Sequence, residues 1–214
     1  MRATSRSDRP RRYVALGDSF TAGAFDSAER SFADRLAGLL RSANPELEYR
    51  NLAVAGARTP EVVAGQLEPA LELEPDVVTL VCGGNDALLA IRPDVRAHTA
   101  ALERALGALR ARLPHAEIAT ATTPDPARFV PLRPRSARRV SRAIDQINEA
   151  TRGAAARHGV PCLDFAAHPE AGARRNYAAD GYHPSAEACR RAAGAFAAVI
   201  GVRLGIQLDT QEVI

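Results

Sequence analysis

Five apolar segments of strand length alternate with segments whose apolar residues recur at helical spacing. This alternation constrains the fold most, because parallel strands need long crossover connections, which are usually helices. The pattern predicts a three-layer α/β domain with a parallel sheet of about five strands. We expect strands at Tyr13–Leu16, Tyr49–Val54, Asp76–Cys82, Ile118–Thr122 and Val160–Phe165, and helices from Phe32 to about Asn44, from Thr59 to about Leu71, from Val95 to Leu113, through Val140–Ile147 and from about Ser185 to Leu204.

The length of 214 residues suits one well-buried domain, and no Pro/Gly/Ser-rich linker divides the chain. We expect residues 1–11 to form a disordered basic tail and residues 12–214 to form a single domain. The N-terminal segment lacks the apolar stretch of a signal peptide, and no apolar run approaches the length of a membrane span. These features predict a cytoplasmic protein with no membrane partner.

The basic character of the chain does not predict a nucleic-acid partner. The formal net charge is only +3, and all 28 basic residues are arginines in an alanine-rich background, which indicates a GC-rich coding sequence. The three cysteines, Cys82, Cys162 and Cys189, have no Cys-x-x-Cys spacing. We therefore expect reduced thiols and neither a disulfide framework nor a zinc site.

Three expected strands are followed by turns that carry residues useful in acyl transfer. Ser19 lies just beyond the first strand, where Gly17 allows a sharp turn, and open α/β sheets place their sites at the carboxyl ends of strands. Gly56 follows the second strand and has no Cβ to obstruct its N–H, and Asn85 follows the third. Each residue alone is also typical of an ordinary turn.

A fourth segment, before the last expected helix, supplies a carboxylate and an imidazole three residues apart, Asp180 and His183. Together the four turns predict a catalytic set in which Ser19 is the nucleophile, His183 the general base and Asp180 the residue that orients the imidazole. The oxyanion would meet the N–H of Ser19, the N–H of Gly56 and the side-chain amide of Asn85.

With these segments in this order, the sequence resembles the GDSL, or SGNH, hydrolase family. The resemblance implies a flavodoxin-like sheet, catalytic roles for Ser19, Gly56, Asn85, Asp180 and His183, no cofactor, and hydrolysis of a small-molecule ester or related acyl bond. The segments that carry it are Gly17-Asp18-Ser19-Phe20, Asn51-Leu52-Ala53-Val54-Ala55-Gly56, Gly83-Gly84-Asn85-Asp86 and Asp180-Gly181-Tyr182-His183-Pro184-Ser185.

Several alternatives remain open from the sequence. The same catalytic set could serve thioester hydrolysis, O-deacetylation of a sugar or acyl transfer to an alcohol, and a non-catalytic binding domain could retain the fold. His168, Asp180 and His183 could form a metal site, although we expect none because these ligands come from one loop. The oligomeric state is not determined by any pattern in the sequence.

The irregular segment between Pro124 and Arg142 follows the fourth expected strand and should overhang the same sheet edge as Ser19. Its apolar residues Phe129, Val130 and Leu132 could line the acyl or alcohol pocket, and the alternative is a solvated loop. Two further sets have expected roles outside the reaction. Asp18 and Asp86 are expected to accept hydrogen bonds in turns, and the histidines expected to be solvated on or near helices are His98, His115 and His158.

Overall fold

The core of the protein is a five-stranded parallel sheet with the strand order β2-β1-β3-β4-β5. The computed structural model describes residues 9–23 and 31–208. The expected number and direction of the strands are therefore confirmed. Their bounds are β1 Arg12–Gly17, β2 Glu48–Asn51, β3 Val77–Val81, β4 Glu117–Ala121 and β5 Cys162–Leu163.

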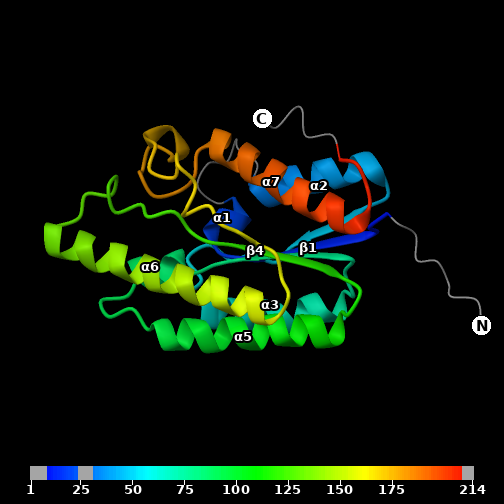
Figure 1. The fold of residues 1–214 in the computed structure, drawn as a ribbon, viewed down its shortest axis with the longest axis horizontal. Coiled ribbons are helices and arrows are strands. Elements are labelled where there is room, and N and C mark those ends of the chain that lie inside the picture. Colours follow the sequence, from blue (N-terminus) through cyan, green and yellow to red (C-terminus); the bar gives the residue numbers. More distant parts are fainter. Residues whose placement is uncertain (1–8, 24–30, 209–214) are drawn as a thin grey trace, which may run out of the picture.

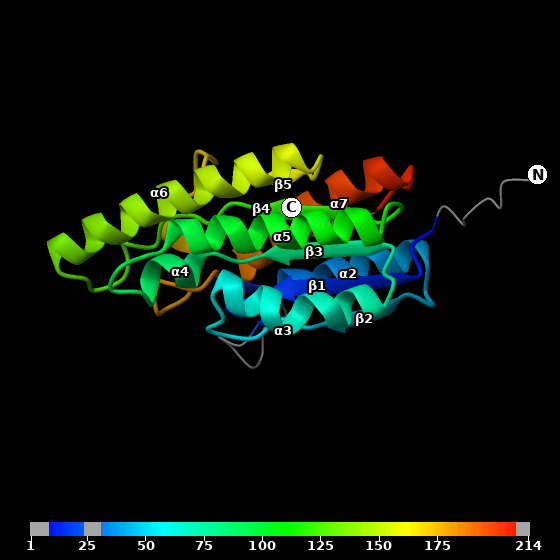
Figure 2. The same ribbon diagram turned by 90° about the horizontal axis from the view of Figure 1, so that it is seen from below.

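Helices cover both faces of the sheet (Figure 1), which confirms the expected three layers. α2 and α7 pack on one face, and α3, α5 and α6 lie side by side across the other (Figure 2). The helices are α1 Ser19–Ala22, α2 Phe32–Ala43, α3 Thr59–Glu72, α4 Gly84–Leu88, α5 Val95–Arg112, α6 Pro134–Arg157 and α7 Ala186–Leu204, with a short 3-10 turn, η1, at Arg174–Asn176.

Strand β1 lies between β2 and β3 and is buried on both faces, which explains its uninterrupted apolar sequence. Tyr13 and Ala15 point into the layer formed with α2 and α7, whereas Val14 and Leu16 point toward α3 and α5. All four are essentially inaccessible to solvent. Burial of a side chain of this kind contributes about 1.5–3 kcal/mol for the larger members, so β1 forms a rigid base for the turn that follows it.

The strand order creates a switch point between β1 and β3. The chain leaves β1 for β2 on one side and then returns to β3 on the other side. In open α/β sheets, ligands bind in the crevice at such a point, beyond the carboxyl ends of the strands. Ser19 follows β1 and Asn85 follows β3, so both candidate residues lie at this crevice.

Two strands are shorter than the sequence suggests. β2 ends at Asn51, whose side chain accepts a hydrogen bond from Ala53 N and donates one to Thr21 O, and this local turn competes with the strand. β5 lies at the sheet edge and pairs only with β4, over two residue pairs. The apolar residues of both segments predict a strand but do not show where the ladder of hydrogen bonds stops.

The described chain begins close to the first strand. Pro10 is buried, and the Arg11 N–H donates to Asp76 Oδ2 at 2.7 Å, so residues 9–11 are placed against the domain. The prediction of a disordered tail otherwise falls on residues 1–8, which lie outside the described residues. Across residues 9–23 and 31–208, no helix is both long and apolar enough to cross a membrane.

Candidate active site

The turn that carries Ser19 requires glycine at Gly17. The φ angle of Gly17 is +153°, and a Cβ at this position would lie 2.2 Å from Val81 O. The side chain of Gln66 also fixes this turn, accepting from Gly17 N at 2.8 Å and donating to Gly17 O at 2.9 Å. Asp18 then caps α1 by accepting from Phe20 N. The backbone at Ser19 is therefore held from both sides.

Ser19, His183 and Asp180 form a continuous chain of hydrogen bonds. Ser19 Oγ lies 3.0 Å from His183 Nε2, and His183 Nδ1 lies 2.6 Å from Asp180 Oδ2. The loop that carries the imidazole is closed locally, because Asp180 Oδ1 accepts from the backbone N–H groups of Tyr182 and His183. The structure thus brings together all three residues that the sequence nominates as nucleophile, base and orienting acid.

Two carboxyl groups near Ser19 have pKa values shifted in opposite directions. Burial raises the pKa of Asp180, but hydrogen bonds from the His183 ring and from the backbone N–H groups outweigh it, so the pKa lies below its usual value. Burial raises the pKa of Asp18 to about 7, and the hydrogen bond from Phe20 N only partly opposes this. Asp180 is therefore an anion at neutral pH, as a partner for an imidazolium requires.

Asn85 is buried in the turn after β3, and two contacts orient its side chain. Its Nδ2 donates to Ala57 O at 3.0 Å, and its Oδ1 accepts from the Tyr182 hydroxyl at 2.7 Å. The amide carries two N–H groups, so one remains for a substrate oxygen. The Tyr182 ring also packs against His183 in a tilted arrangement, with ring centroids 4.6 Å apart, and so Tyr182 joins the loop of His183 to Asn85. No pattern in the sequence distinguishes Tyr182 from the other residues of its segment.

Gly56 and Ser19 offer the other two expected oxyanion donors. Gly56 has a φ angle of +82° and lies in an exposed turn after β2. Within the described residues, neither its N–H nor that of Ser19 has a hydrogen-bond acceptor. Both groups can therefore donate to a ligand without breaking an internal hydrogen bond.

Next to Asn85, the side chains of Asp86, Thr59 and His98 form a buried polar cluster. Asp86 Oδ2 lies 2.9 Å from Thr59 N and 3.0 Å from Thr59 Oγ1, so Asp86 accepts from a neighbouring helix rather than only within its own turn. His98 contacts the same hydroxyl through Nδ1 at 2.8 Å and Thr151 through Nε2. The expectation that His98 is solvated was wrong, since this ring is fully buried.

The burial of His98 has an electrostatic consequence. Desolvation lowers the pKa of its ring, which favours a neutral imidazole that bridges two hydroxyl groups. Spacing alone does not reveal this role, because His98 occupies the same helix face as apolar residues of α5. The other two histidines of the set lie nearer the surface: His115 is exposed, and half-buried His158 pairs with Glu103 at 2.7 Å.

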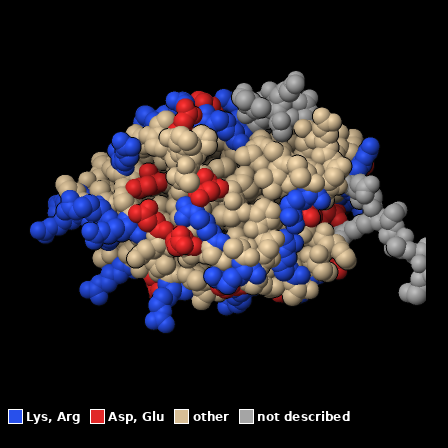
Figure 3. Space-filling model, viewed as in Figure 1, with Lys and Arg blue, Asp and Glu red and all other residues tan. Residues whose placement is uncertain are grey.

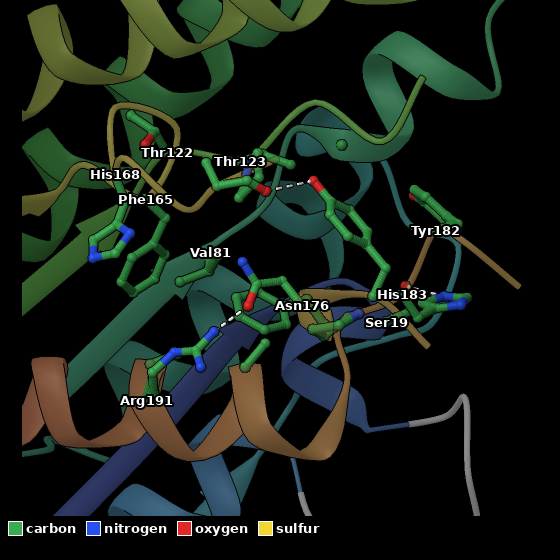
Figure 4. A pocket seen from close by; sticks show the side chains of 18 of the residues that line it. Ser19, Val81, Thr122, Thr123, Phe165, His168, Asn176, Tyr182, His183 and Arg191 are labelled. Carbon is green, nitrogen blue, oxygen red and sulfur yellow. Dashed lines mark hydrogen bonds between the residues drawn. The ribbon is translucent and has the colours of Figure 1, made fainter. Parts of the chain in front are cut away.

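A cavity of about 250 Å³ opens beside Ser19. In Figure 4, Ser19 and His183 lie on one side of it and Phe165 and His168 on the other, while Arg191 reaches from α7 to a hydrogen bond with Asn176. Most of the wall is apolar, with the polar groups confined to a few points. The apolar part of the wall consists of Phe20, Val81, Phe165, Tyr177, Ala171, Ala188, Ala192, Ala195, Pro124 and Pro184.

The residues expected to line this pocket from the loop after β4 lie elsewhere. The Phe129 ring packs on Tyr177, with ring centroids 4.7 Å apart. Its backbone carbonyl lies against Gly181, where an added Cβ would lie only 2.4 Å from the carbonyl oxygen. Leu132 packs against the cluster around Val140, and Val130 is half-buried beyond Pro126. Of this loop, only Pro124 and the preceding threonines reach the cavity wall. Phe129 contacts it indirectly, through Tyr177.

The alternative metal site is not assembled in the described residues. No group of three or more histidine, cysteine, aspartate or glutamate side chains there is arranged to hold a metal ion. His168 Nδ1 instead accepts from Glu170 N at 3.2 Å, while His183 faces Ser19 and Asp180. No disulfide joins the three cysteines, all of which lie in the described part of the chain, with Cys82 and Cys189 buried and Cys162 half-buried.

Solved structures with a similar fold include lipases and esterases. The lipase/acylhydrolase from Enterococcus faecalis is 22% identical, with a TM-score of 0.71 over 94% of this chain and 98% of that chain. The psychrotrophic esterase EstA from Pseudoalteromonas sp. is 18% identical, with a TM-score of 0.69 over 91% of this chain and 99% of that chain. The extracellular lipase from Streptomyces rimosus is 24% identical, with a TM-score of 0.60 over 82% of this chain and 93% of that chain.

At these identities the solved structures establish the fold, and the family follows from a different comparison. A search of curated proteins found no relative of this chain. The model of the GDSL-like Lipase/Acylhydrolase family matches residues 15–191, a range that contains all four segments on which the sequence resemblance rests. The expected enzyme class, a serine hydrolase acting on ester bonds, is confirmed with it. The chain belongs to the GDSL-like lipase/acylhydrolase family.

Proposed function

We propose that the protein is a serine esterase that hydrolyses a small or medium acyl ester through an acyl-enzyme on Ser19. The observation that carries this proposal is the hydrogen-bonded chain from Ser19 Oγ to His183 at 3.0 Å and from His183 to Asp180 at 2.6 Å. A serine hydroxyl is a weak nucleophile unless a positioned base takes its proton, and this chain supplies one.

In the acylation half, Ser19 Oγ attacks the ester carbonyl while its proton passes to His183 Nε2. Asp180 stabilises the imidazolium that forms, because it remains an anion at neutral pH. The tetrahedral oxyanion accepts hydrogen bonds from Ser19 N, Gly56 N and Asn85 Nδ2. Collapse of this intermediate breaks the bond to the alcohol oxygen, which leaves with the proton from His183.

In the deacylation half, a water molecule attacks the acyl-enzyme and gives its proton to His183. The second tetrahedral intermediate collapses with cleavage of the bond to Ser19 Oγ, which recovers its proton from the imidazolium. The carboxylic acid product then leaves. The same two steps would serve a thioester, an acetylated sugar or an alcohol acceptor in place of water, so the substrate must be decided by the pocket.

The shape and polarity of the cavity favour an uncharged acyl group of limited length. A volume of about 250 Å³ with a mostly apolar wall suits an aliphatic chain, and each methylene buried there contributes about 0.8 kcal/mol. Arg191 and Asn176 are already hydrogen-bonded to each other in the wall, so they add a polar point to a mostly apolar lining. We expect catalytic efficiency to rise with chain length and then fall when the cavity is full.

The test combines an activity series with a covalent probe. p-Nitrophenyl esters from acetate to palmitate, with a matched thioester, should give kcat/KM values that peak at a short or medium chain. A fluorophosphonate probe should label Ser19, identified by peptide mapping, and Ser19→Ala should abolish both labelling and turnover without lowering the melting temperature. Full labelling of the alanine variant would refute the nucleophile assignment, and absence of turnover on every ester and thioester would favour a binding domain.

A further inference from the structure

Arginines on the first half of α6 face a second recess, of about 330 Å³, which shares no lining residue with the cavity beside Ser19. They are spaced i, i+3, i+4 and i+7, so their side chains lie on one face of the helix. Figure 3 shows basic side chains projecting from the end of the molecule where α6 begins. The recess is lined by Pro93, Arg135, Arg138, Arg139, Arg142, Ala143 and Gln146.

The positive charge of this recess is not compensated within the described residues. No carboxylate lines it, and none of its four arginines forms an ion pair there. In the second half of the same helix, by contrast, Arg152 pairs with Asp164 and Arg157 with Glu103. The first turn of α6 also lacks an acidic residue, although the start of a helix already carries partial positive charge. An anion in the recess would relieve this repulsion.

Arg139 connects the recess to the segment that follows α4. Its Nη1 donates to Ile91 O at 2.8 Å, which holds the guanidinium against the loop between α4 and α5. Its Nε–H is buried and has no hydrogen-bond acceptor among the described residues. A buried donor without a partner is costly, and a small rotation that offers this N–H to a ligand oxygen would remove the cost.

The chemistry of the donors indicates which anion fits. Guanidinium groups bind phosphate and carboxylate oxygens in pairs of parallel hydrogen bonds. Four of them around one recess suit a group with several oxygens and more than one negative charge, which favours a phosphate monoester over a single carboxylate. Beside the recess, the loop exposes Leu89 and Ile91 at 62% and 84% of their surface. Such neighbours could contact the apolar part of a phospholipid.

We propose that the recess between the α4–α5 loop and α6 binds a phosphate group with more than one negative charge. The group belongs either to a small soluble molecule or to the headgroup of an anionic phospholipid. The second source departs from the expectation of no membrane partner, and it requires only docking at the surface. The proposal is independent of the catalytic assignment, because no residue of the recess takes part in the proposed reaction.

The soluble source is tested by titrating the protein with inorganic pyrophosphate at low ionic strength. Calorimetry gives the affinity, and the ¹⁵N–¹H signal of Arg139 Nε, assigned by its loss in Arg139→Gln, reports contact at the site. We expect this signal to shift on binding. Arg138→Gln/Arg142→Gln should weaken binding at least about tenfold, since hydrogen bonds to charged groups are worth more than one such factor.

The matched control is Arg50→Gln/Arg104→Gln, which removes the same charge from two exposed arginines on β2 and α5, outside the recess. The affinity of this control variant for pyrophosphate should change by less than about twofold, because salt screens distant surface charges. Equal weakening by the two double variants would mean a general charge effect and would overturn the site. Melting curves of both variants verify that they are folded.

The lipid source is tested by sedimentation with phosphatidylcholine vesicles that contain phosphatidic acid, against phosphatidylcholine alone. If a headgroup is the ligand, Leu89→Ser/Ile91→Ser should reduce binding to the acidic vesicles and leave pyrophosphate binding unchanged. If only pyrophosphate binds, the ligand is soluble. Failure of the wild-type protein to bind either pyrophosphate or acidic vesicles would refute the proposal.

Discussion

The two sides of the candidate active site are built in different ways. His183 and Asp180 lie on a loop, with 22% and 47% of their side chains exposed, and hydrogen bonds within the loop hold them. Asn85 and Asp86 lie on the other side, are at most 5% exposed, and are supported by Thr59 and His98 in the core. In the proposed reaction, the side that exchanges protons is accessible, whereas the side that donates to the oxyanion is buried.

Because of this difference, substitutions on the two sides should have different effects on turnover and on stability. Substitutions on the exposed side should lower turnover and leave the melting temperature nearly unchanged, because little buried structure depends on those side chains. Substitutions on the buried side should lower both, because each removes a partner from a group that water cannot reach.

The largest effect is expected on the exposed side, from Asp180→Asn. An amide cannot stabilise the imidazolium and favours the wrong tautomer of His183, so kcat should fall by up to roughly 10⁴-fold. The melting temperature should stay close to that of Asp145→Asn, a control at an exposed position on α6. A large drop in melting temperature with normal kcat would reverse the comparison.

Asn85→Ala should have the next largest effect, on the buried side. Loss of one oxyanion donor is expected to lower kcat by roughly 10²–10³-fold, about 3–4 kcal/mol of transition-state stabilisation, with little change in KM. Because Ala57 O and the Tyr182 hydroxyl lose their partner, the free energy of unfolding should also fall, by about 1–3 kcal/mol. Denaturant titration and steady-state kinetics on the same sample measure the two effects.

A loss of stability with unchanged kcat in Asn85→Ala would assign this residue to the turn alone. A loss of kcat without loss of stability would mean that its contacts with Ala57 and Tyr182 contribute nothing to folding. Either result would break the link between rigidity and catalysis that the buried side is expected to show.

The sequence was sufficient to predict the fold and the juxtaposition of Ser19, His183 and Asp180, because both depend on local signals. Buried parallel strands leave apolar runs, and the turns after them carry chemistry-bearing residues at the ends of those runs. Contacts between segments far apart in the chain leave no such signal. His98 has the spacing of the apolar residues of α5, and Tyr182 is a sequence neighbour of His183, but neither pattern indicates the contacts with Thr59 and Asn85.

The pocket walls illustrate the same limit. Phe129 lies in the loop that was expected to cover Ser19, but its ring packs on Tyr177, and the cavity is lined instead by small residues of α7 such as Ala188 and Ala192. Alanines on a helix give no indication of whether they face a core or a cavity. The chain order places this loop after β4, and Pro124 at its start does reach the cavity wall. The direction in which its later side chains point depends on tertiary packing.

A pH-dependent effect on stability is expected from Asp18, which lies between the two sides. Its pKa is raised to about 7 by burial, so the folded state keeps this proton to higher pH than the unfolded state does. Stability from this group therefore falls as the pH rises from about 4 to about 7. With about 1.4 kcal/mol per pKa unit, wild-type protein should lose about 2–3 kcal/mol more than Asp18→Asn between pH 5 and pH 8.

The measurement for Asp18 is the difference in unfolding free energy between the two proteins at each pH, which cancels all other titrating groups. Asparagine can still cap α1 by accepting from Phe20 N, so the helix start should be retained. Parallel pH curves for the two proteins would show that the Asp18 carboxylate reaches solvent, and the turn would then belong with the exposed side.

The smallest effect, and the most direct test of how the two sides are joined, is expected from Tyr182→Phe. The phenylalanine ring can keep the packing against His183 but cannot donate to Asn85 Oδ1, a contact of 2.7 Å. Loss of one neutral hydrogen bond should cost about 1 kcal/mol, which corresponds to a fall in kcat of roughly fivefold if the bond orients the amide. In a double-mutant cycle with Asn85→Ala, the kcat effect of Tyr182→Phe should vanish, because no amide remains to be oriented. An equal effect of Tyr182→Phe in both backgrounds would mean that Tyr182 acts on His183 alone, and that the exposed and buried sides are energetically separate.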